Sequence, residues 1–392
     1  MIPAQRTQQI APFQVMEIIK RADALEAQGR SIIHLSIGEP DQGTPLAVVQ
    51  AAQAALQAGR TRYTPALGLP ALRAAIGRHY EQLYGVQVDA ERVVVTAGAS
   101  GALLLACAAL VDPSAEVLMA DPGYPCNRHF VAAADGVARL VNCGPQARFQ
   151  LLPDAAAAAW SSATRGLLVA SPANPTGTSL TREETRALVD LATDRDGFAI
   201  VDEIYGGLSY GTAPRWSAAA LPQAVVVNSF SKYFCMTGWR LGWLVLPPPL
   251  VPIVERLAQN LFICPSAIAQ HAALACFEPE TIRLLETRRE AFRSRRDYLV
   301  PALEALGLQV PAAPDGAFYV YVDVSRVSAD SAQFAADLLE TTGVCIVPGA
   351  DFGRAAGSRY VRISYAASQP QLEEAVRRVA GFLAERRGPR GA

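Results

Sequence analysis

The sequence predicts an α/β protein in which helices cover both faces of a mostly parallel sheet, with a smaller α+β domain attached. Between about residues 92 and 245, apolar strand-like runs alternate with helical segments, which is typical of a parallel sheet. After about residue 285 the chain changes to a long arginine-rich helix followed by the strand AFYVYVDV. A chain of 392 residues also exceeds the size at which one core keeps growing, which predicts two domains.

The N-terminal segment is expected to belong to the smaller domain. Apolar residues at helical spacing predict a helix over 13–29, and SIIHLSIGEPDQGTP predicts a short strand and a turn in which Gly38 lets a ligand approach the backbone. We therefore expect an N-terminal arm and helix, part of the small domain, over 1–45, a large ligand-binding domain over 46–285, and a C-terminal small domain over 286–392.

The remaining elements follow from periodicity and turn residues. Helices are expected at 45–59, in PALRAAIGRHY after a loop that holds Tyr63 and Gly68, at 155–159, at 182–192 and at 331–343. Strands are expected in RVVVT, EVLMAD, 137–142, GLLVA, GFAIVD, AVVVNS, RLGWLV, CIVPG and RYVRISYA.

Polar side chains gather where these strands end. Because ligands bind beyond the carboxyl ends of parallel strands, we expect one site built from the residues that follow them. These are Ser100, Tyr124, Asn174, Asp202 and Ser229. The turn TAGASG, with Gly98, Ala99 and Ser100, leads into a helix and predicts an anion site at its N-terminus. The chain has no Gly-x-Gly and no Gly-Lys pair, which excludes the dinucleotide fingerprint and the P-loop.

One lysine stands out in the segment NSFSKYFCMTGWRLGW. Only Lys20 and Lys232 are lysines among the 35 cationic residues, and an amine can be a nucleophile where a guanidinium cannot. Ser229, Ser231 and Arg240 accompany Lys232. This set fits pyridoxal phosphate: Lys232 would bind the aldehyde, the serines, Arg240 and the amides near Ala99 and Ser100 would hold the phosphate, and Asp202 would keep the ring nitrogen protonated.

Composition excludes several other functions. A net charge of −1 with dispersed arginines gives no reason to expect nucleic acid or an anionic membrane as partner. The longest apolar run, 102–111, is half a bilayer span, and the first residues show no signal-peptide core, so we expect a cytoplasmic protein. Seven cysteines without a Cys-x-x-Cys pair and four scattered histidines predict neither disulfides nor a metal site.

The motifs together resemble the class I and II aminotransferases, of the aspartate aminotransferase-like fold type I of pyridoxal phosphate enzymes. The resemblance rests on Ser-Phe-Ser-Lys with Met-Thr-Gly-Trp-Arg, on Asp-Glu-x-Tyr at 202–205 and on Asn-Pro-Thr-Gly at 174–177. It extends from the Gly-Glu-Pro-Asp turn at Gly38 to Val-Arg-Ile-Ser at 361–364, which is nearly the whole chain.

The resemblance implies a role for each candidate residue. Lys232 is similar to the lysine that binds the cofactor and then moves a proton between the substrate Cα and the cofactor, and Asp202 to the partner of the ring nitrogen. Tyr205 and Asn174 would bind the ring oxygen, and Tyr124 would stack on the ring. Arg362, with Gly38 and Asn174, would bind the substrate α-carboxylate. Tyr63 is similar to a tyrosine that reaches the phosphate of a second subunit, which implies a homodimer.

The expected activity is transfer of the amino group of an L-amino acid to a 2-oxo acid such as 2-oxoglutarate, by a ping-pong mechanism. Phe13 and Val15, in a stretch that is Ser- and Thr-rich in aspartate-specific relatives, favour a neutral or hydrophobic substrate side chain. So does the absence of a polar or basic residue after Ser100. Aspartate transamination and a carbon–sulfur lyase remain alternatives of the same fold. A transcription regulator with an aminotransferase-like domain would need an N-terminal DNA-binding domain, which we do not expect. Taken alone, Arg362 also fits an edge strand facing water, and Tyr63 a packing residue.

Overall fold

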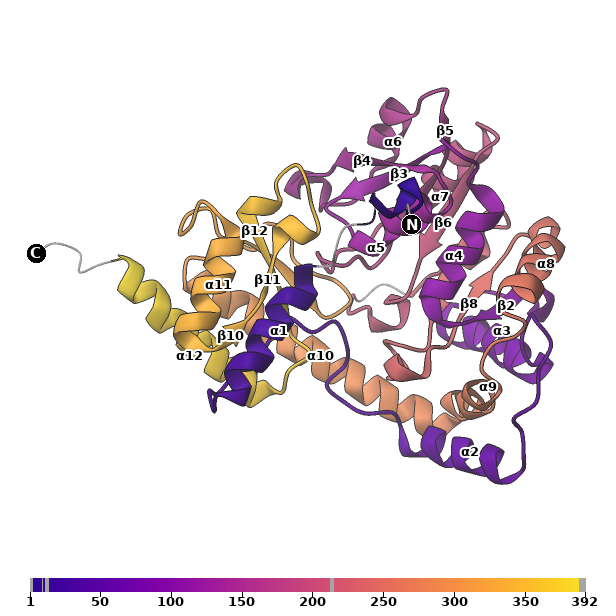
Figure 1. Cartoon of the computed structure of the whole chain (residues 1–392), viewed down its shortest axis with the longest axis horizontal. Coiled ribbons are helices and arrows are strands. Elements are labelled where there is room, and N and C mark those ends of the chain that lie inside the picture. Colours follow the sequence, from indigo (N-terminus) through magenta and orange to yellow (C-terminus); the bar gives the residue numbers. More distant parts are fainter. Residues whose placement is uncertain (1–2, 9, 11–13, 212–214, 388–392) are drawn as a thin grey trace, which may run out of the picture.

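The structure, a computed structural model, describes residues 3–8, 10, 14–211 and 215–387. Figure 1 shows a larger unit built around a seven-stranded sheet and a smaller unit formed by the C-terminal elements together with α1 (Gln14–Ala27). This α/β architecture confirms the predicted fold class.

The large sheet is parallel except for one strand. Its order is β2 (Val93–Thr96), β8 (Gly242–Val245), β7 (Ala224–Ser229), β6 (Phe198–Asp202), β5 (Thr164–Ala170), β3 (Glu116–Asp121) and β4 (Val137–Asn142). Strands β3 to β7 pair in parallel, whereas β8 runs antiparallel to both β7 and β2. The carboxyl ends of β5, β6 and β7 therefore meet at one edge, as the sequence predicts.

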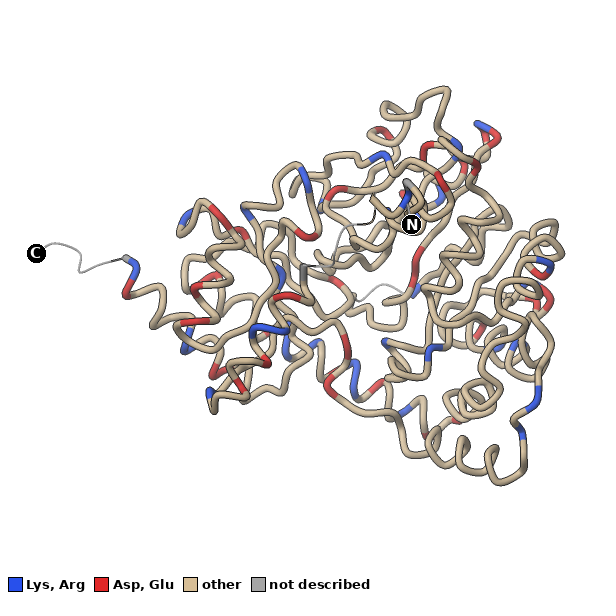
Figure 2. Tube along the Cα trace, in the orientation of Figure 1, with Lys and Arg blue, Asp and Glu red and all other residues tan. Residues whose placement is uncertain are grey.

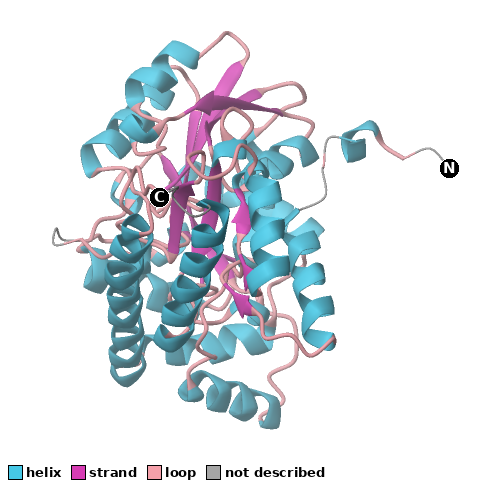
Figure 3. Ribbon diagram, turned by 90° about the vertical axis from the view of Figure 1, so that its left-hand side faces the viewer, coloured by secondary structure: helices cyan, strands magenta, loops and turns pink. Residues whose placement is uncertain are grey.

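Helices cover both faces of this sheet because its strands are apolar on both sides. In β7, Val225 and Val227 pack into one core cluster and Val226 into the other. The first cluster includes residues of α4 (Gly98–Leu110), α5 (Pro125–Ala133) and α8 (Val251–Leu261). The second includes residues of α2 (Leu46–Gln57), α3 (Pro70–Tyr84), α6 (Pro153–Ala159), α7 (Arg182–Thr193) and α9 (Ala267–Ala273). Figure 3 shows the strands enclosed between helices.

The smaller unit contains two short sheets. An antiparallel sheet has the order β11 (Val347–Pro348), β12 (Tyr360–Ser364) and β9 (Tyr319–Asp323), and β1 (Ile33–His34) pairs in parallel with β10 (Val344–Cys345). Helices α11 (Ser331–Thr342) and α12 (Gln369–Arg387) pack together, and α1 contacts β10 and β11. Helix α1 thus packs on the smaller unit, whereas Arg6, nearer the N-terminus, pairs with Asp135 of the larger unit at 2.9 Å.

Helix α10 (Pro279–Ala305) connects the two units. It contacts α12 in the smaller unit and the short turn 274–277 in the larger one. It begins at Pro279, since proline is favoured in the first turn of a helix. The proposed boundary at residue 285 thus falls inside α10, which contacts both units.

Charges of both signs alternate over the described chain, in keeping with a net charge of −1 (Figure 2). Within the described ranges, none of the helices has the length and apolar character needed to cross a membrane.

Candidate active site

A cavity of about 340 Å³ opens at the edge of the large sheet where β5 and β6 end, and β12 contributes to it from the smaller unit. Most of the residues predicted from the sequence line it. They are Gly38, Ala99, Ser100, Tyr124, Asn174, Asp202, Tyr205, Ser231, Lys232, Arg240 and Arg362. Gly98, Ser229 and Tyr63 are not among its lining residues.

Lys232 lies in the loop that follows β7, and its amine donates a hydrogen bond to the Gly38 carbonyl oxygen. The pKa of Lys232 is lowered from 10.5 to about 8, chiefly by burial; Arg362 and Arg240 also lower it, while Glu39 and Asp202 raise it. A larger fraction of the amine is therefore neutral near pH 7 than for an exposed lysine. A neutral, desolvated amine is the form that attacks an aldehyde.

Asp202 is the last residue of β6, and it is buried. Its Oδ1 accepts a hydrogen bond from the Ile204 amide at 3.1 Å. Burial raises the pKa of Asp202 to about 6, against the lowering effects of that amide and of Lys232. A cation or a protonated ring nitrogen placed against this carboxylate would stabilise its ionised form.

The N-terminus of α4 lines the cavity together with Arg240 and Ser231, and these groups could form a cradle for an anion. The residue before the helix, Ala97, has no side chain that could cap it, so the first amides lack a capping acceptor. A Cβ on Gly98, whose φ is +74°, would meet the Arg240 guanidinium at 2.8 Å. The guanidinium therefore packs directly on this turn, where a bound phosphate would meet both.

Two further residues hold the cradle together from behind. Ser229 lies beneath Ser231, whose amide donates to the Ser229 hydroxyl at 3.1 Å. Ser229 is thus placed to orient Ser231 rather than to face the cavity. A Cβ on Gly242, in β8, would meet the Ala99 amide nitrogen at 2.8 Å, so glycine is required for β8 to pass this close to the turn.

Arg362 is a buried cation without a carboxylate partner among the described residues. It is 2% exposed in the central strand of its sheet, so the alternative of an edge-strand arginine facing water is wrong. Its Nη1 donates to Asn174 Oδ1 at 3.0 Å and its Nη2 to the Ser36 carbonyl oxygen, whereas Nε has no hydrogen-bond partner in the described structure. A buried guanidinium with only neutral acceptors is suited to a ligand carboxylate.

The three tyrosines predicted from the sequence occupy different places around the site. Tyr205 and Tyr124 line the cavity, and the Tyr205 hydroxyl is 2.8 Å from that of Tyr319. Tyr63 is 85% exposed and outside the cavity of its own chain. Its predicted role at a second subunit's site stays a prediction.

The sequence reasoning missed several lining residues. These are Ile37, Glu39, Leu103, Phe130, Ala170, Ile204, Thr237 and Tyr319. Tyr319 lies in the run AFYVYVDV, where alternation puts Tyr319 and Tyr321 on one face of β9. That alternation signals a shared face, but only the pairing of β9 with β12 places Tyr319 beside Arg362. Phe13 lies outside the described residues.

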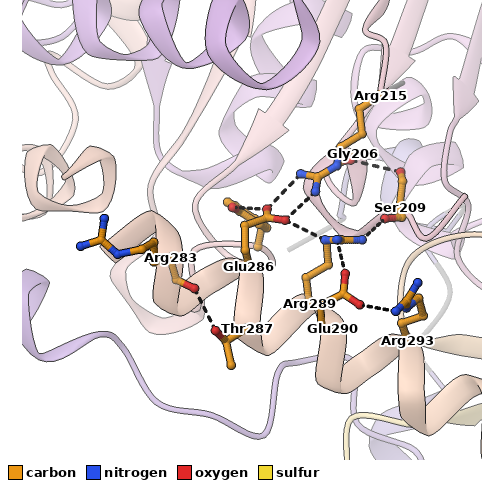
Figure 4. A network of polar contacts seen from close by, with 10 residues as sticks. Gly206, Ser209, Arg215, Arg283, Glu286, Thr287, Arg289, Glu290 and Arg293 are labelled. Atoms are coloured by element: carbon orange, nitrogen blue, oxygen red, sulfur yellow. Dashed lines mark hydrogen bonds and ion pairs between the residues drawn. The ribbon is translucent and has the colours of Figure 1, made fainter. Parts of the chain in front are cut away.

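Glu286 of α10 is the centre of a polar network that includes Arg215 and Arg289 (Figure 4). Glu286 accepts a hydrogen bond at 2.7 Å from the hydroxyl of Tyr233, the residue that directly follows Lys232. The network therefore ties the Lys232 segment to α10. Arg215 binds both oxygens of Glu286 at 3.0 and 2.6 Å, and Arg289 adds a third contact at 2.9 Å. Burial opposes ionisation, yet the hydrogen bonds from Arg215 and Tyr233 lower the pKa of Glu286 to about 2.

We expect the substitution Glu286→Gln to lower the free energy of unfolding at pH 7 by about 1–2 kcal/mol, because it removes charge-assisted hydrogen bonds. The folded-state pKa lies below the ordinary value of 4.5, so ionised Glu286 stabilises the fold fully above about pH 4.5. That contribution is lost as the pH falls towards 2, and the difference between variant and wild type should shrink accordingly. Urea unfolding at several pH values measures it.

Glu280→Gln is the matched control for this prediction. Glu280 lies on the same helix, but its side chain is 85% exposed and it pairs with Arg283 at the surface. Exposed ion pairs contribute about 0–1 kcal/mol, so its unfolding curve should stay close to that of the wild type. Equal unfolding midpoints for Glu286→Gln and wild type at pH 7 would show that the network is not stabilising.

The lining residues fit pyridoxal phosphate. The partly buried amine of Lys232, with its lowered pKa, suits an aldehyde, and the uncapped N-terminus of α4 with Arg240 and Ser231 suits a phosphate. A ring nitrogen has the buried carboxylate of Asp202. The unpartnered Arg362 Nε then leaves a separate place for the carboxylate of a substrate.

Fold and site together define a pyridoxal phosphate-dependent transferase of fold type I. Residues 30–379 match the family Aminotransferase class I and II, and the chain belongs to this family. It is thus a pyridoxal phosphate-dependent aminotransferase with the aspartate aminotransferase fold.

Similar proteins of known class match this chain over almost its entire length. It is 42% identical over 376 residues to the valine–pyruvate aminotransferase of Mycobacterium tuberculosis, covering 95% of this chain and 97% of that protein. A crystal structure of an aminotransferase from the same organism superposes with a TM-score of 0.94 at 41% identity, covering 98% and 99%. Aspartate aminotransferase from Thermus thermophilus with maleate gives a TM-score of 0.91 at 35% identity, covering 97% and 99%.

Proposed function

We propose that this aminotransferase moves the α-amino group of an L-amino acid with a neutral or hydrophobic side chain to a 2-oxo acid such as 2-oxoglutarate, in two half-reactions at one site. The observation that carries the proposal is a single cavity that holds a partly buried amine, a buried carboxylate and a buried arginine that has no counter-ion among the residues the structure describes. These are Lys232, Asp202 and Arg362.

The proposed cofactor contacts follow from the lining. When bound, pyridoxal phosphate supplies an aldehyde and a ring that accepts electrons. Lys232 would hold the aldehyde carbon, and Asp202 would keep the ring nitrogen protonated. Ser231, Arg240 and the first amides of α4 bind the phosphate, with Gly98 giving Arg240 room and Ser229 orienting Ser231. Tyr124 and Tyr205 contact the ring.

The substrate is held by its carboxylate. Arg362 binds the α-carboxylate, and Asn174, whose oxygen accepts from Arg362, keeps its amide nitrogen free to donate to the ligands. A carboxylate held by the Arg362 guanidinium would be stabilised as a carboxylate, which favours loss of the Cα proton over decarboxylation. The Lys232 amine would serve as the base that takes the proton from the substrate Cα and as the acid that returns it.

Three features argue against a second carboxylate on the substrate side chain. The cationic lining residues, among those the structure describes, are Lys232, Arg240 and Arg362, and each has a proposed role. The charge left over is that of Glu39, which repels a second carboxylate. The remaining lining includes the apolar side chains of Val15, Ile37, Leu103 and Phe130.

Two alternatives lead to different products. The Thermus thermophilus relative is named an aspartate aminotransferase, which keeps aspartate as a candidate donor. A lyase of the same fold would use Lys232 and Asp202 to eliminate a side-chain group from a sulfur amino acid.

Incubation with a panel of L-amino acids and 2-oxoglutarate distinguishes the three activities. We expect a new oxo acid and glutamate, formed fastest with neutral donors. Ammonia and pyruvate formed without an acceptor would favour the lyase.

We also propose a homodimer in which Tyr63 reaches the phosphate site of the second subunit. Tyr63, Leu261 and Ile263 are large apolar residues that are at least half exposed in the single chain. Analytical ultracentrifugation is expected to give twice the mass of one chain, and Tyr63→Phe to weaken cofactor affinity without dissociating the dimer. A monomeric wild-type protein would refute the homodimer. Unchanged cofactor affinity in Tyr63→Phe would refute the role of Tyr63 at the phosphate site.

The rate at which cofactor-free protein captures pyridoxal phosphate should depend on the ionisation of Lys232. Because its pKa is about 8, we expect the rate to rise with pH through about 8 and then level off, as followed by stopped-flow absorbance. The variant Glu39→Gln removes a charge that raises this pKa, and should move the midpoint to lower pH. A rate that still rises steeply near pH 10 would contradict a desolvated lysine.

A further inference from the structure

Tyr319 touches both halves of the proposed site. It lies in β9, its side chain is fully buried, and it lines the cavity. Its hydroxyl is 2.8 Å from the Tyr205 hydroxyl, and the centre of its ring is 4.5 Å from Arg362 Cζ. A Cβ on Gly38 would meet the Tyr319 hydroxyl at 2.9 Å, so the chain passes it at a glycine.

The hydrogen bond between the two tyrosines has two possible directions. Each hydroxyl has one proton, which it can donate once. If Tyr205 donated to Tyr319, only its lone pairs would remain for a ligand in the cavity. If Tyr319 donates to Tyr205, the Tyr205 proton stays available, and a negatively charged oxygen in the cavity stabilises this arrangement.

The ring of Tyr319 has a second, separable effect. The Arg362 guanidinium lies against Tyr319 and against Phe352, whose ring centre is 4.8 Å from Cζ. Aromatic faces attract a cation and restrict its rotation. The ring therefore acts on the residue proposed to bind the substrate, and the hydroxyl acts on a residue proposed to bind the cofactor.

We propose that Tyr319 is a positioning residue whose hydroxyl donates to Tyr205 and thereby directs the Tyr205 proton at the cofactor ring oxygen, while its ring holds Arg362 ready for the substrate carboxylate. The proposal rests on the proposed function. It adds a residue that acts through Tyr205 and Arg362 and links the two binding events.

The variants Tyr319→Phe and Tyr319→Leu separate the two effects. Without the hydroxyl, Tyr205 stabilises the ring oxygen less, so the cofactor bound to Lys232 should hold its proton more tightly. Titration of the visible absorbance of the holoenzyme should then show a pKa higher by about 0.5 unit or more in both variants. KM for the amino acid should stay within about twofold in Tyr319→Phe and rise about tenfold in Tyr319→Leu, which also loses the ring.

Two further variants make the test specific. Tyr365→Phe removes another fully buried hydroxyl, one that contacts the Gly316 and Ala317 carbonyl oxygens, and should leave the titration unchanged. Tyr205→Phe should raise the same pKa, and adding Tyr319→Phe to it should cause no further rise, because coupled residues are not additive.

The outcomes distinguish the inference from the function on which it rests. A visible absorbance that titrates identically in wild type and Tyr319→Phe would overturn the inference, as would additive shifts in the double variant. Absence of any visible absorbance in wild-type protein supplied with pyridoxal phosphate would instead overturn the proposed role of Lys232.

Discussion

Lys232→Ala is expected to give a folded protein that has no visible absorbance from bound cofactor and no measurable turnover. The substitution removes the amine that binds the cofactor and the group that moves the proton at Cα. Loss of proton transfer alone costs about 10²–10⁴-fold in rate, and loss of the covalent attachment adds to it. The measurements are the absorbance spectrum of the purified protein and the rate of amino transfer at saturating donor and acceptor.

Lys20→Ala is the control that the chain itself offers. Lys20 is the other lysine of the sequence, exposed on α1 and paired with Glu17 at 2.7 Å. An exposed pair contributes about 0–1 kcal/mol, so this variant should keep the spectrum and the turnover of the wild type. Turnover retained by Lys232→Ala, or lost in Lys20→Ala, would contradict the assignment.

Arg362→Ala is expected to weaken substrate binding much more than cofactor binding. The variant leaves the substrate α-carboxylate in a buried site without its charged partner, at a cost of about 3 kcal/mol, or roughly a hundredfold in KM. The absorbance of the bound cofactor should remain, because the proposed cofactor contacts do not include Arg362. Steady-state kinetics with varied donor and varied acceptor should show the effect for both substrates, since both present the same carboxylate to the same arginine.

A nearby arginine provides the comparison. Arg359, just before β12, pairs with Asp323 at 2.7 Å and has a side chain that is 56% exposed. Arg359→Ala should change KM by less than about twofold. An unchanged KM in Arg362→Ala would leave its burial against Tyr319 and Phe352 as a purely structural feature.

The elements of the large unit could be predicted because their signals are local. The strand expected at 137–142 and the helix expected from Arg182 are found with those limits or within a residue of them. Helix α7 starts where Thr181 and Glu184 form a capping box, which is readable in the sequence. Helix α10 begins at Pro279 rather than near Glu286, because the proline can occupy the first turn of a helix.

The site was predictable to the extent that its residues follow strands. Asp202 and Asn174 come after apolar runs, so topology alone brings them to one edge. Arg362 is different: the run VRIS does not say whether its strand is central or at an edge, and pairing with both β9 and β11 decides its burial. Ser229 and Ser231 are two residues apart, yet only tertiary packing places Ser231 at the cavity and Ser229 behind it.

The presence of only two lysines makes one measurement decisive for the central claim. Holoenzyme is treated with borohydride to fix the cofactor on its lysine, digested, and mapped by mass spectrometry. Our account predicts the reduced cofactor on the peptide that contains Lys232 and unmodified Lys20. Modification of Lys20, or of neither lysine in protein that shows the visible absorbance, would contradict it.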